Sequence, residues 1–119
     1  MKHCLVVDNS RVIRKVACGI LEQLHFVTLE AADTLSALDA CRASMPDAIL
    51  LDVPQQASLE FLRKLRREPD GDHPVVVLCT TENDVPKIEE AMSAGADDYV
   101  MKPFNRGVLA DKFAQAGLI

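Results

Sequence analysis

The sequence predicts an α/β domain built from five strand–helix units, with a five-stranded parallel sheet between two layers of helices. Short apolar runs of strand length alternate along the chain with stretches whose apolar residues recur at helical spacing. This alternation implies parallel strands joined by right-handed crossovers, with helices on both faces of the sheet. The 119 residues can close one real core, and they contain no repeat, linker or low-complexity stretch. We therefore expect residues 1–119 to form a single domain.

Five apolar runs mark the expected strands. All have strand length and several are rich in β-branched residues, which is typical of strands buried on both faces of a parallel sheet. The runs are residues 4–7, 26–29, 48–51, 75–79 and 99–101.

Apolar residues at helical spacing predict one helix after each strand, and the first stripe is the widest. The stripes are Val12, Ile13, Val16, Ala17, Ile20, Leu21 and Leu24; Leu35, Leu38 and Cys41; Leu59, Leu62 and Leu65; Val85, Ile88, Ala91 and Met92; and Val108, Leu109, Phe113 and Ala116. Residues that favour N-caps stand near the expected starts, namely Ser10, Asp33, Ser58, Asp84 and Asn105. Gly95 follows the fourth helix as a terminating glycine would, and residues 69–74 have the composition of a loop.

The bulk composition argues against several classes of protein. A formal charge of −5 argues against a nucleic-acid-binding surface. No uninterrupted apolar run approaches the ~20 residues that a membrane span needs, and the first residues lack the features of a signal peptide, so we expect a cytoplasmic location. The four cysteines are widely spaced and mostly lie in apolar segments, which favours buried reduced thiols over disulfides or a zinc site.

Four of the five apolar runs end in a polar residue at the carboxyl end. These residues are Asp8, Asp52, Thr80 and Lys102. Because ligands of open α/β sheets bind beyond the carboxyl ends of the strands, we expect the four side chains to converge. Each one alone is also compatible with a helix cap or a turn. Together, two carboxylates, a hydroxyl and an ammonium suit phosphoryl transfer to a carboxylate, with an oxygen-bound Mg²⁺ neutralising charge.

The segments around these residues resemble the receiver domain of CheY-like response regulators. The similarity covers the whole chain and includes Val-Val-Asp-Asn-Ser-Arg at 6–11, Leu-Leu-Asp at 50–52, Cys-Thr-Thr-Glu-Asn at 79–83, Gly-Ala-Asp-Asp-Tyr at 95–99 and Met-Lys-Pro-Phe at 101–104. The resemblance implies a flavodoxin-like fold with strand order 2-1-3-4-5.

The resemblance also implies a role for each matching residue. Asp52 would be the phospho-acceptor, Thr80 the switch hydroxyl and Lys102 the lysine that senses the phosphoryl group. Asp8 and Asn9 occupy the positions of the metal-binding pair, and Asp52 and the Pro54 carbonyl would complete the Mg²⁺ ligands. Tyr99 resembles the switch aromatic, and the Lys102–Pro103 peptide would be cis.

Two departures from the family pattern fall on the metal site. Asn9 stands where the family usually has an acid, so one negative charge is missing, and Mg²⁺ binding should weaken by roughly tenfold or more. The loop after Asp52 is about two residues shorter than usual and lacks glycine, and the fixed φ of Pro54 can turn its carbonyl elsewhere. We therefore expect Mg²⁺ to bind weakly or not at all.

These departures leave two hypotheses open. One is an atypical receiver that binds partners without depending on phosphorylation; the other is a fully phosphorylatable switch charged by a sensor histidine kinase at Asp52. An aspartate-nucleophile phosphatase is a distant third, because it would want a second acid two residues after Asp52. We expect a stand-alone domain without enzymatic activity, whose output passes through a kinase or a downstream protein. By analogy with the family, that partner would contact the face formed by the fourth helix, fifth strand and fifth helix.

Overall fold

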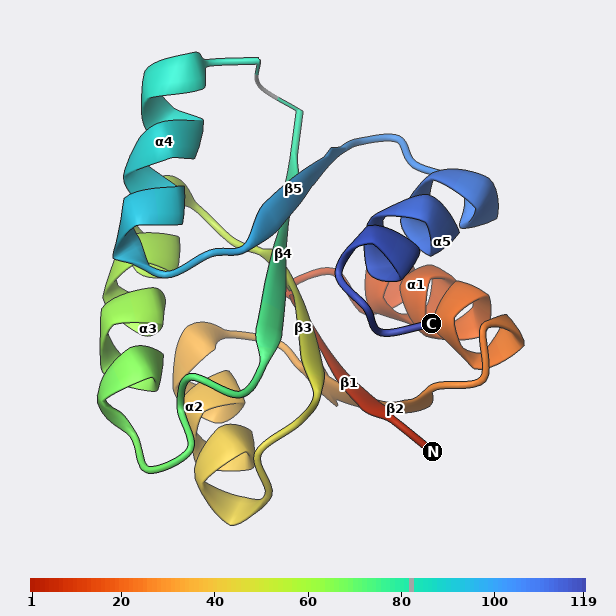
Figure 1. The fold of residues 1–119 in the computed structure, drawn as a ribbon, viewed down its shortest axis with the longest axis horizontal. Helices are drawn as coiled ribbons and strands as arrows, with labels where there is room; N and C mark the ends of the chain where they lie inside the picture. The colour runs from red at the N-terminus through yellow and green to blue at the C-terminus, as the bar shows by residue number, and fades with distance from the viewer. Residues whose placement is uncertain (82) are drawn as a thin grey trace.

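A computed structural model describes residues 1–81 and 83–119, and it contains the alternating strands and helices that the sequence predicts (Figure 1). The elements in chain order are β1 (His3–Asp8), α1 (Arg11–Gln23), β2 (Val27–Ala31), α2 (Thr34–Ala43), β3 (Ala48–Asp52), α3 (Gln55–Arg67), β4 (Val75–Thr80), α4 (Val85–Ala94), β5 (Asp98–Met101) and α5 (Arg106–Gln115).

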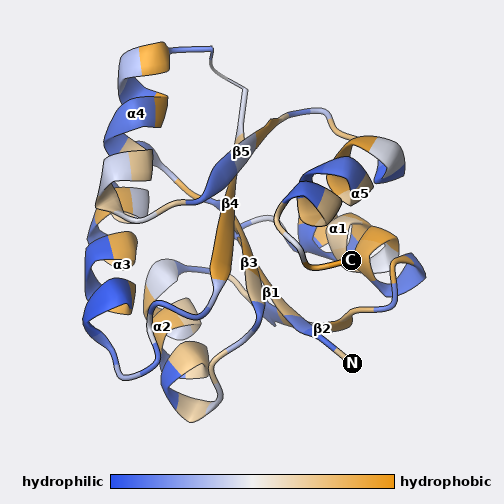
Figure 2. Ribbon diagram, in the orientation of Figure 1, coloured by the Kyte–Doolittle hydropathy of each residue, from blue (hydrophilic) through white to orange (hydrophobic). Residues whose placement is uncertain are grey.

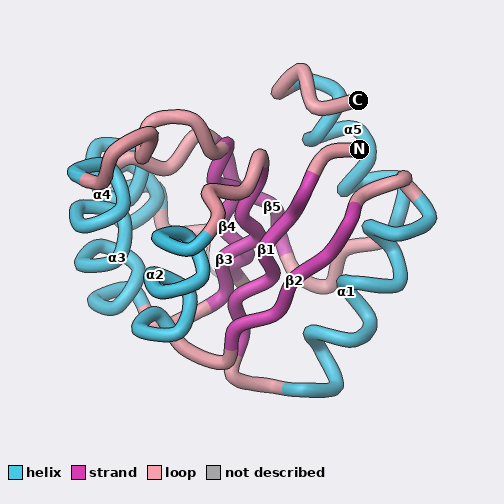
Figure 3. The backbone as a smooth tube through the Cα atoms, turned by 90° about the horizontal axis from the view of Figure 1, so that it is seen from below, coloured by secondary structure: helices cyan, strands magenta, loops and turns pink. Residues whose placement is uncertain are grey.

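The sheet has the predicted order, β2-β1-β3-β4-β5, and its neighbouring strands pair in parallel. Helices α1 and α5 cover one face, and α2, α3 and α4 cover the other (Figures 1 and 3). The register pairs Asp8 with Asp52 at the carboxyl ends of β1 and β3. The fold thus places the two acids side by side before any side-chain interaction is considered.

Two hydrophobic cores, one on each face of the sheet, explain the continuous apolar runs. In β1, Leu5 and Val7 belong to the core under α2 and α3, whereas Cys4 and Val6 belong to the core under α1 and α5. Figure 2 shows a largely hydrophobic β4 at the centre, between helices in which hydrophobic and hydrophilic residues alternate. Because central strands are buried on both sides, they show no alternation with polar residues.

Four of the five expected N-caps are confirmed and one is wrong. The side chains of Ser10, Asp33, Asp84 and Asn105 each accept a backbone N–H from the first turn of their helix. Helix α3 instead begins three residues before Ser58, with Pro54 at the N-cap and no side-chain cap. Ser58 is buried within the helix, and its hydroxyl donates to the Val53 carbonyl over 3.3 Å.

The wide apolar stripe of the first helix is only partly buried. Ala17 and Leu21 are buried, as expected, but Val12, Ile13 and Val16 are 71, 45 and 58% exposed. The stripe correctly predicts the helix, but only part of it faces the core. The periodicity spans a wider arc of the helix than the sheet can cover.

The structure also describes the cysteines and the helix lengths. Cys4, Cys18 and Cys41 are buried free thiols, as predicted, and Cys79 is a half-buried one. Across the described residues, no helix has both the length and the hydrophobicity needed to cross a membrane.

Candidate functional site

The four polar residues at the strand ends come together at one edge of the sheet. Asp8 and Asp52 end the adjacent strands β1 and β3, and Thr80 ends β4. Lys102 follows β5 directly, and its backbone N–H donates to the Thr80 carbonyl over 2.8 Å. The Lys102–Pro103 peptide is cis, as the family resemblance implies.

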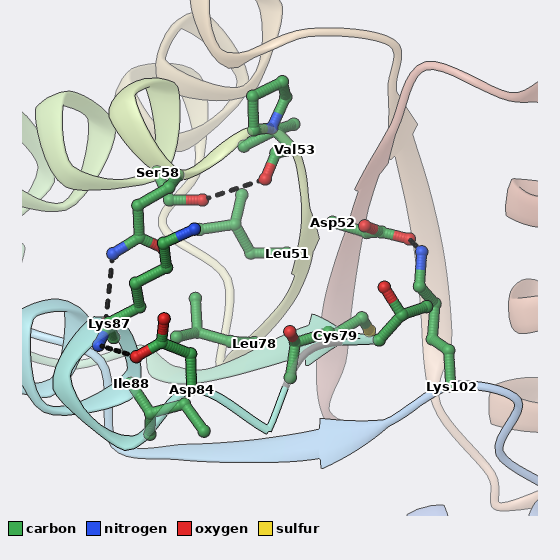
Figure 4. Close-up of a pocket in the computed structure, with 14 residues that line it drawn as sticks. Leu51, Asp52, Val53, Ser58, Leu78, Cys79, Asp84, Lys87, Ile88 and Lys102 are labelled. Carbon is green, nitrogen blue, oxygen red and sulfur yellow. Dashed lines mark hydrogen bonds and ion pairs between the residues drawn. The ribbon is translucent and has the colours of Figure 1, made fainter.

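Asp52 forms the central contact of this group. The Lys102 ammonium donates to Asp52 Oδ2 over 2.6 Å, and Figure 4 shows the two side chains meeting. Burial raises the pKa of the Asp52 carboxyl, with the adjacent Asp8 carboxyl acting in the same direction and Lys102 acting against it. The ion pair with Asp52 in turn raises the pKa of Lys102. The Asp52 carboxylate therefore already has a cation, the Lys102 ammonium, as its direct partner.

Asp8 is the most deeply placed member of the group. It is 6% exposed, and its Oδ1 accepts the Ser10 N–H over 2.8 Å at the start of α1. The Arg14 guanidinium donates to the backbone carbonyl of Asp8 over 2.7 Å. Asp8 thus holds the turn into α1 while its carboxylate faces Asp52.

A cavity of about 360 Å³ opens beside Asp52 and extends between the first turns of α3 and α4 (Figure 4). Thr80 and Lys102 line it together with Asp52, so three predicted site residues share one space. Its remaining lining residues are Leu51, Val53, Pro54, Gln55, Ser58, Leu78, Cys79, Thr81, Asp84, Lys87 and Ile88. Glu82, which belongs to the motif at 79–83, lies outside the described residues.

The other two predicted metal ligands, Asn9 and the Pro54 carbonyl, do not share the buried position of Asp8. Asn9 is exposed in the turn between β1 and α1. The Pro54 carbonyl accepts the Ser58 N–H over 3.0 Å, as the first acceptor of helix α3. A carbonyl in this position points along the helix, away from its N-terminal end. The structure therefore gives this oxygen a different partner from the one that the sequence analysis assigned to it.

These donors fit Mg²⁺ only in part. The carboxylates of Asp8 and Asp52 are adjacent and are the oxygen ligands that Mg²⁺ prefers. The Pro54 carbonyl, the third predicted oxygen, already accepts the Ser58 N–H at the start of α3, so one of its two lone pairs is engaged. Within residues 1–81 and 83–119, no group of three or more His, Cys, Asp or Glu side chains is placed to hold a metal ion. A bound ion would depend on two carboxylates and on water.

Tyr99, which resembles the family's switch aromatic, is half-buried in β5. It packs against the core under α3 and α4, and the Lys112 ammonium lies 4.9 Å from the centre of its ring. Lys112 also bonds Asp98 Oδ1 over 3.1 Å. The ring therefore contacts the core on the α4 side of β5 and, at the edge of the sheet, the ammonium of Lys112 from α5.

Sequence reasoning missed Gln55 as a residue of the site. Gln55 lines the cavity from the first position of α3, and its side chain bonds to α4. The sequence feature that pointed to it is the short loop after Asp52, which brings the start of α3 close to Asp52. The loop alone does not reveal which side chain reaches α4.

Comparisons with known proteins agree with this geometry. A family model for the response regulator receiver domain matches residues 4–114. This chain belongs to that family. Among curated receiver-containing proteins, it is 36% identical over 107 residues to the phosphate regulon transcriptional regulatory protein PhoB of Escherichia coli. It is 29% identical to the chemotaxis protein CheY of Halobacterium salinarum, with 92% of each chain covered.

The receiver spans about half the length of the PhoB relatives that it matches, since it covers 46% of them and they cover 87% of it. Its fold is similar to that of the Vibrio cholerae chemotaxis regulator CheY4, with a TM-score of 0.89, 28% identity, and 97 and 98% of the two chains covered. The receiver domain of the Pseudomonas aeruginosa sensor kinase PA1611 has a TM-score of 0.85 at 25% identity, with 96 and 95% covered. That structure holds a magnesium ion in its active-site cleft.

Proposed function

We propose that this receiver is atypical: it signals through protein contacts that do not depend on stoichiometric phosphorylation, although Asp52 keeps the acceptor position. The observation that carries this proposal is the engagement of the Pro54 carbonyl in the first turn of α3. Asn9 removes a further charge from the metal pair, and Lys102 already neutralises Asp52 at 2.6 Å. These features favour weak Mg²⁺ binding and a slow reaction at Asp52.

The metal site limits the chemistry because phosphoryl transfer to a carboxylate brings together several negative charges. Mg²⁺, when bound, neutralises part of that charge. Without a full set of ligands, Lys102 is the cation that this chain supplies to the site. The Lys102 ammonium on Asp52 Oδ2 withdraws charge from the carboxylate, which lowers the nucleophilicity of Asp52.

The alternative is a fully phosphorylatable switch, which the convergence of Asp52, Thr80 and Lys102 on one cavity favours. An Asp52 oxygen would attack the phosphorus of a phosphohistidine, and the P–N bond would break as the P–O bond forms. Lys102 would then pair with a phosphoryl oxygen, and Thr80 would donate its hydroxyl proton to another. The phosphoryl group would be transferred from a sensor histidine kinase.

For output, we propose the face formed by α4, β5 and α5 as the contact with a kinase or a downstream protein. Three large apolar side chains are exposed on its elements: Val85 in α4 (56%), Met101 in β5 (38%) and Val108 in α5 (40%). We further propose a cytoplasmic binding module without turnover of its own.

Intact-mass analysis after incubation with acetyl phosphate tests the atypical function. We expect little or no phosphoryl adduct on the wild-type chain at physiological Mg²⁺. Asn9→Asp restores a ligand charge and should both tighten Mg²⁺ binding in a titration and raise the adduct yield. Asp52→Asn is the control, and an adduct that persists in it would place the reaction at another residue. A stoichiometric adduct on wild-type Asp52 at physiological Mg²⁺ would instead support the phosphorylatable switch.

A further inference from the structure

Gln55 joins the segment after Asp52 to helix α4. It is the first residue of α3, three positions after Asp52. Its side-chain amide donates to the Lys87 carbonyl over 3.0 Å and to Glu90 Oε1 over 3.3 Å. Both acceptors lie in α4, which runs beside α3 (Figures 1 and 3).

Helix α4 needs such a contact because little of its surface is buried. Ala91 is its single fully buried residue, whereas α3 buries five. Hydrophobic burial therefore stabilises α4 less than it stabilises its neighbour. The two hydrogen bonds from Gln55 add to this limited packing.

The backbone between Asp52 and Gln55 is short and stiff. Only Val53 and Pro54 separate them, and Pro54 holds φ at −55° while its carbonyl starts α3. The position of Gln55 is thus determined by the same turn that draws the Pro54 carbonyl into the helix. The shortened loop that weakens the metal site also brings a donor to α4.

We propose that Gln55 is a positioning residue that fixes α4, and with it the exposed Val85 of the output face, in the unphosphorylated protein. This inference rests on the proposed function, because it explains how the face is preset without a phosphoryl group. Gln55 acts on α4 through hydrogen bonding and takes no part in the chemistry at Asp52.

Hydrogen–deuterium exchange of the amides of residues 85–94 tests the proposal on the unphosphorylated chain without Mg²⁺. Gln55→Leu keeps most of the side-chain volume and removes the donor, and we expect α4 amides to exchange about tenfold faster. Gln56→Leu is the matched control, since Gln56 is exposed and its side chain bonds Glu60 of its own helix, over 3.2 Å. Exchange of β3 amides should remain unchanged in both variants.

A donor-restoring variant separates hydrogen bonding from packing. Gln55→Lys can still donate to the Lys87 carbonyl and pair with Glu90, so it should retain the wild-type protection of α4. Unchanged α4 exchange in Gln55→Leu, equal acceleration in Gln56→Leu, or failure of Gln55→Lys to protect α4 would each overturn the proposal. The proposed function is tested separately by the mass experiment, in which a stoichiometric phosphoryl adduct on Asp52 would contradict it.

Discussion

At the residue scale, the burial of Asp52 carries an energetic cost when its carboxyl is ionised. Burial raises the pKa of its carboxyl, with Asp8 adding to the effect, so the folded state holds the Asp52 proton more tightly than the unfolded chain does. By linkage, the stability contribution of this group is present at low pH and is lost as pH rises through the folded pKa. At neutral pH, ionised Asp52 therefore destabilises the fold relative to a neutral isostere.

Asp52→Asn should accordingly raise the thermal midpoint at pH 7 by a few degrees, and the gain should shrink as the pH falls toward the ordinary pKa of Asp, about 4. Lys102 loses its partner in this variant but is 31% exposed, so its ammonium can turn to water. Thermal unfolding at several pH values measures the effect. Asp39→Asn is the control, because the Asp39 side chain is 70% exposed and should show no such pattern. A lower thermal midpoint for Asp52→Asn than for the wild type at pH 7 would contradict the claim that ionised Asp52 destabilises the fold.

Individual residues also show what the sequence could predict of the site. Asp8, Asp52, Thr80 and Lys102 were predictable because each ends an apolar run, and parallel strands bring their ends to one edge. The direction of the Pro54 carbonyl was not, because it depends on where α3 begins, and no side-chain cap marks that start. Gln55 was missed because its acceptors lie more than thirty residues away in α4.

At the scale of elements, Arg66 joins the end of α3 to two loops and to the start of β5. Its guanidinium donates to the carbonyls of Gly71 (2.8 Å), Pro74 (2.9 Å) and Gly95 (2.6 Å), and it pairs with Asp97 at 3.0 Å. Gly95 sits close against it, with φ at +130°, where a Cβ would lie 2.8 Å from Arg66 Cγ. One planar donor group thus replaces several separate contacts between elements.

Arg66→Lys should lower the free energy of unfolding by roughly 2–3 kcal/mol, since a single ammonium cannot reach carbonyls on both sides. Urea denaturation measures the loss. Arg63→Lys, on the exposed side of α3, should change stability little. If both variants unfold at the same urea concentration as the wild type, Arg66 does not hold these elements together.

Elements were predictable in type and order, but less so in their buried surfaces. Alternating runs gave five strands and five helices because each period reports a local geometry. The width of the α1 stripe overstates the surface that α1 buries, since Val12 and Val16 continue the apolar period onto the solvent side of the helix. Whether an apolar residue is covered depends on neighbouring elements, which periodicity does not describe.

At the scale of the whole molecule, the reactivity of the four cysteine thiols can measure local and global unfolding. Cys4 and Cys18 lie in the core under α1 and α5, Cys41 lies in the opposite core, and Cys79 borders the cavity at Asp52. Burial raises the pKa of all four thiols, and that of Cys41 reaches about 11. Native thiols are thus both shielded and protonated, so reaction with a thiol reagent requires opening.

We expect Cys79 to react first with a disulfide reagent, through local opening beside the cavity. The other three should react together, at the rate of global unfolding, because the same strands contribute residues to both cores and couple their stability. Mass spectrometry of time-resolved labelling, with and without urea, measures each site. If Cys41 were labelled well before Cys4 and Cys18, the core under α2 and α3 would open by itself, and the two faces would not unfold as one unit.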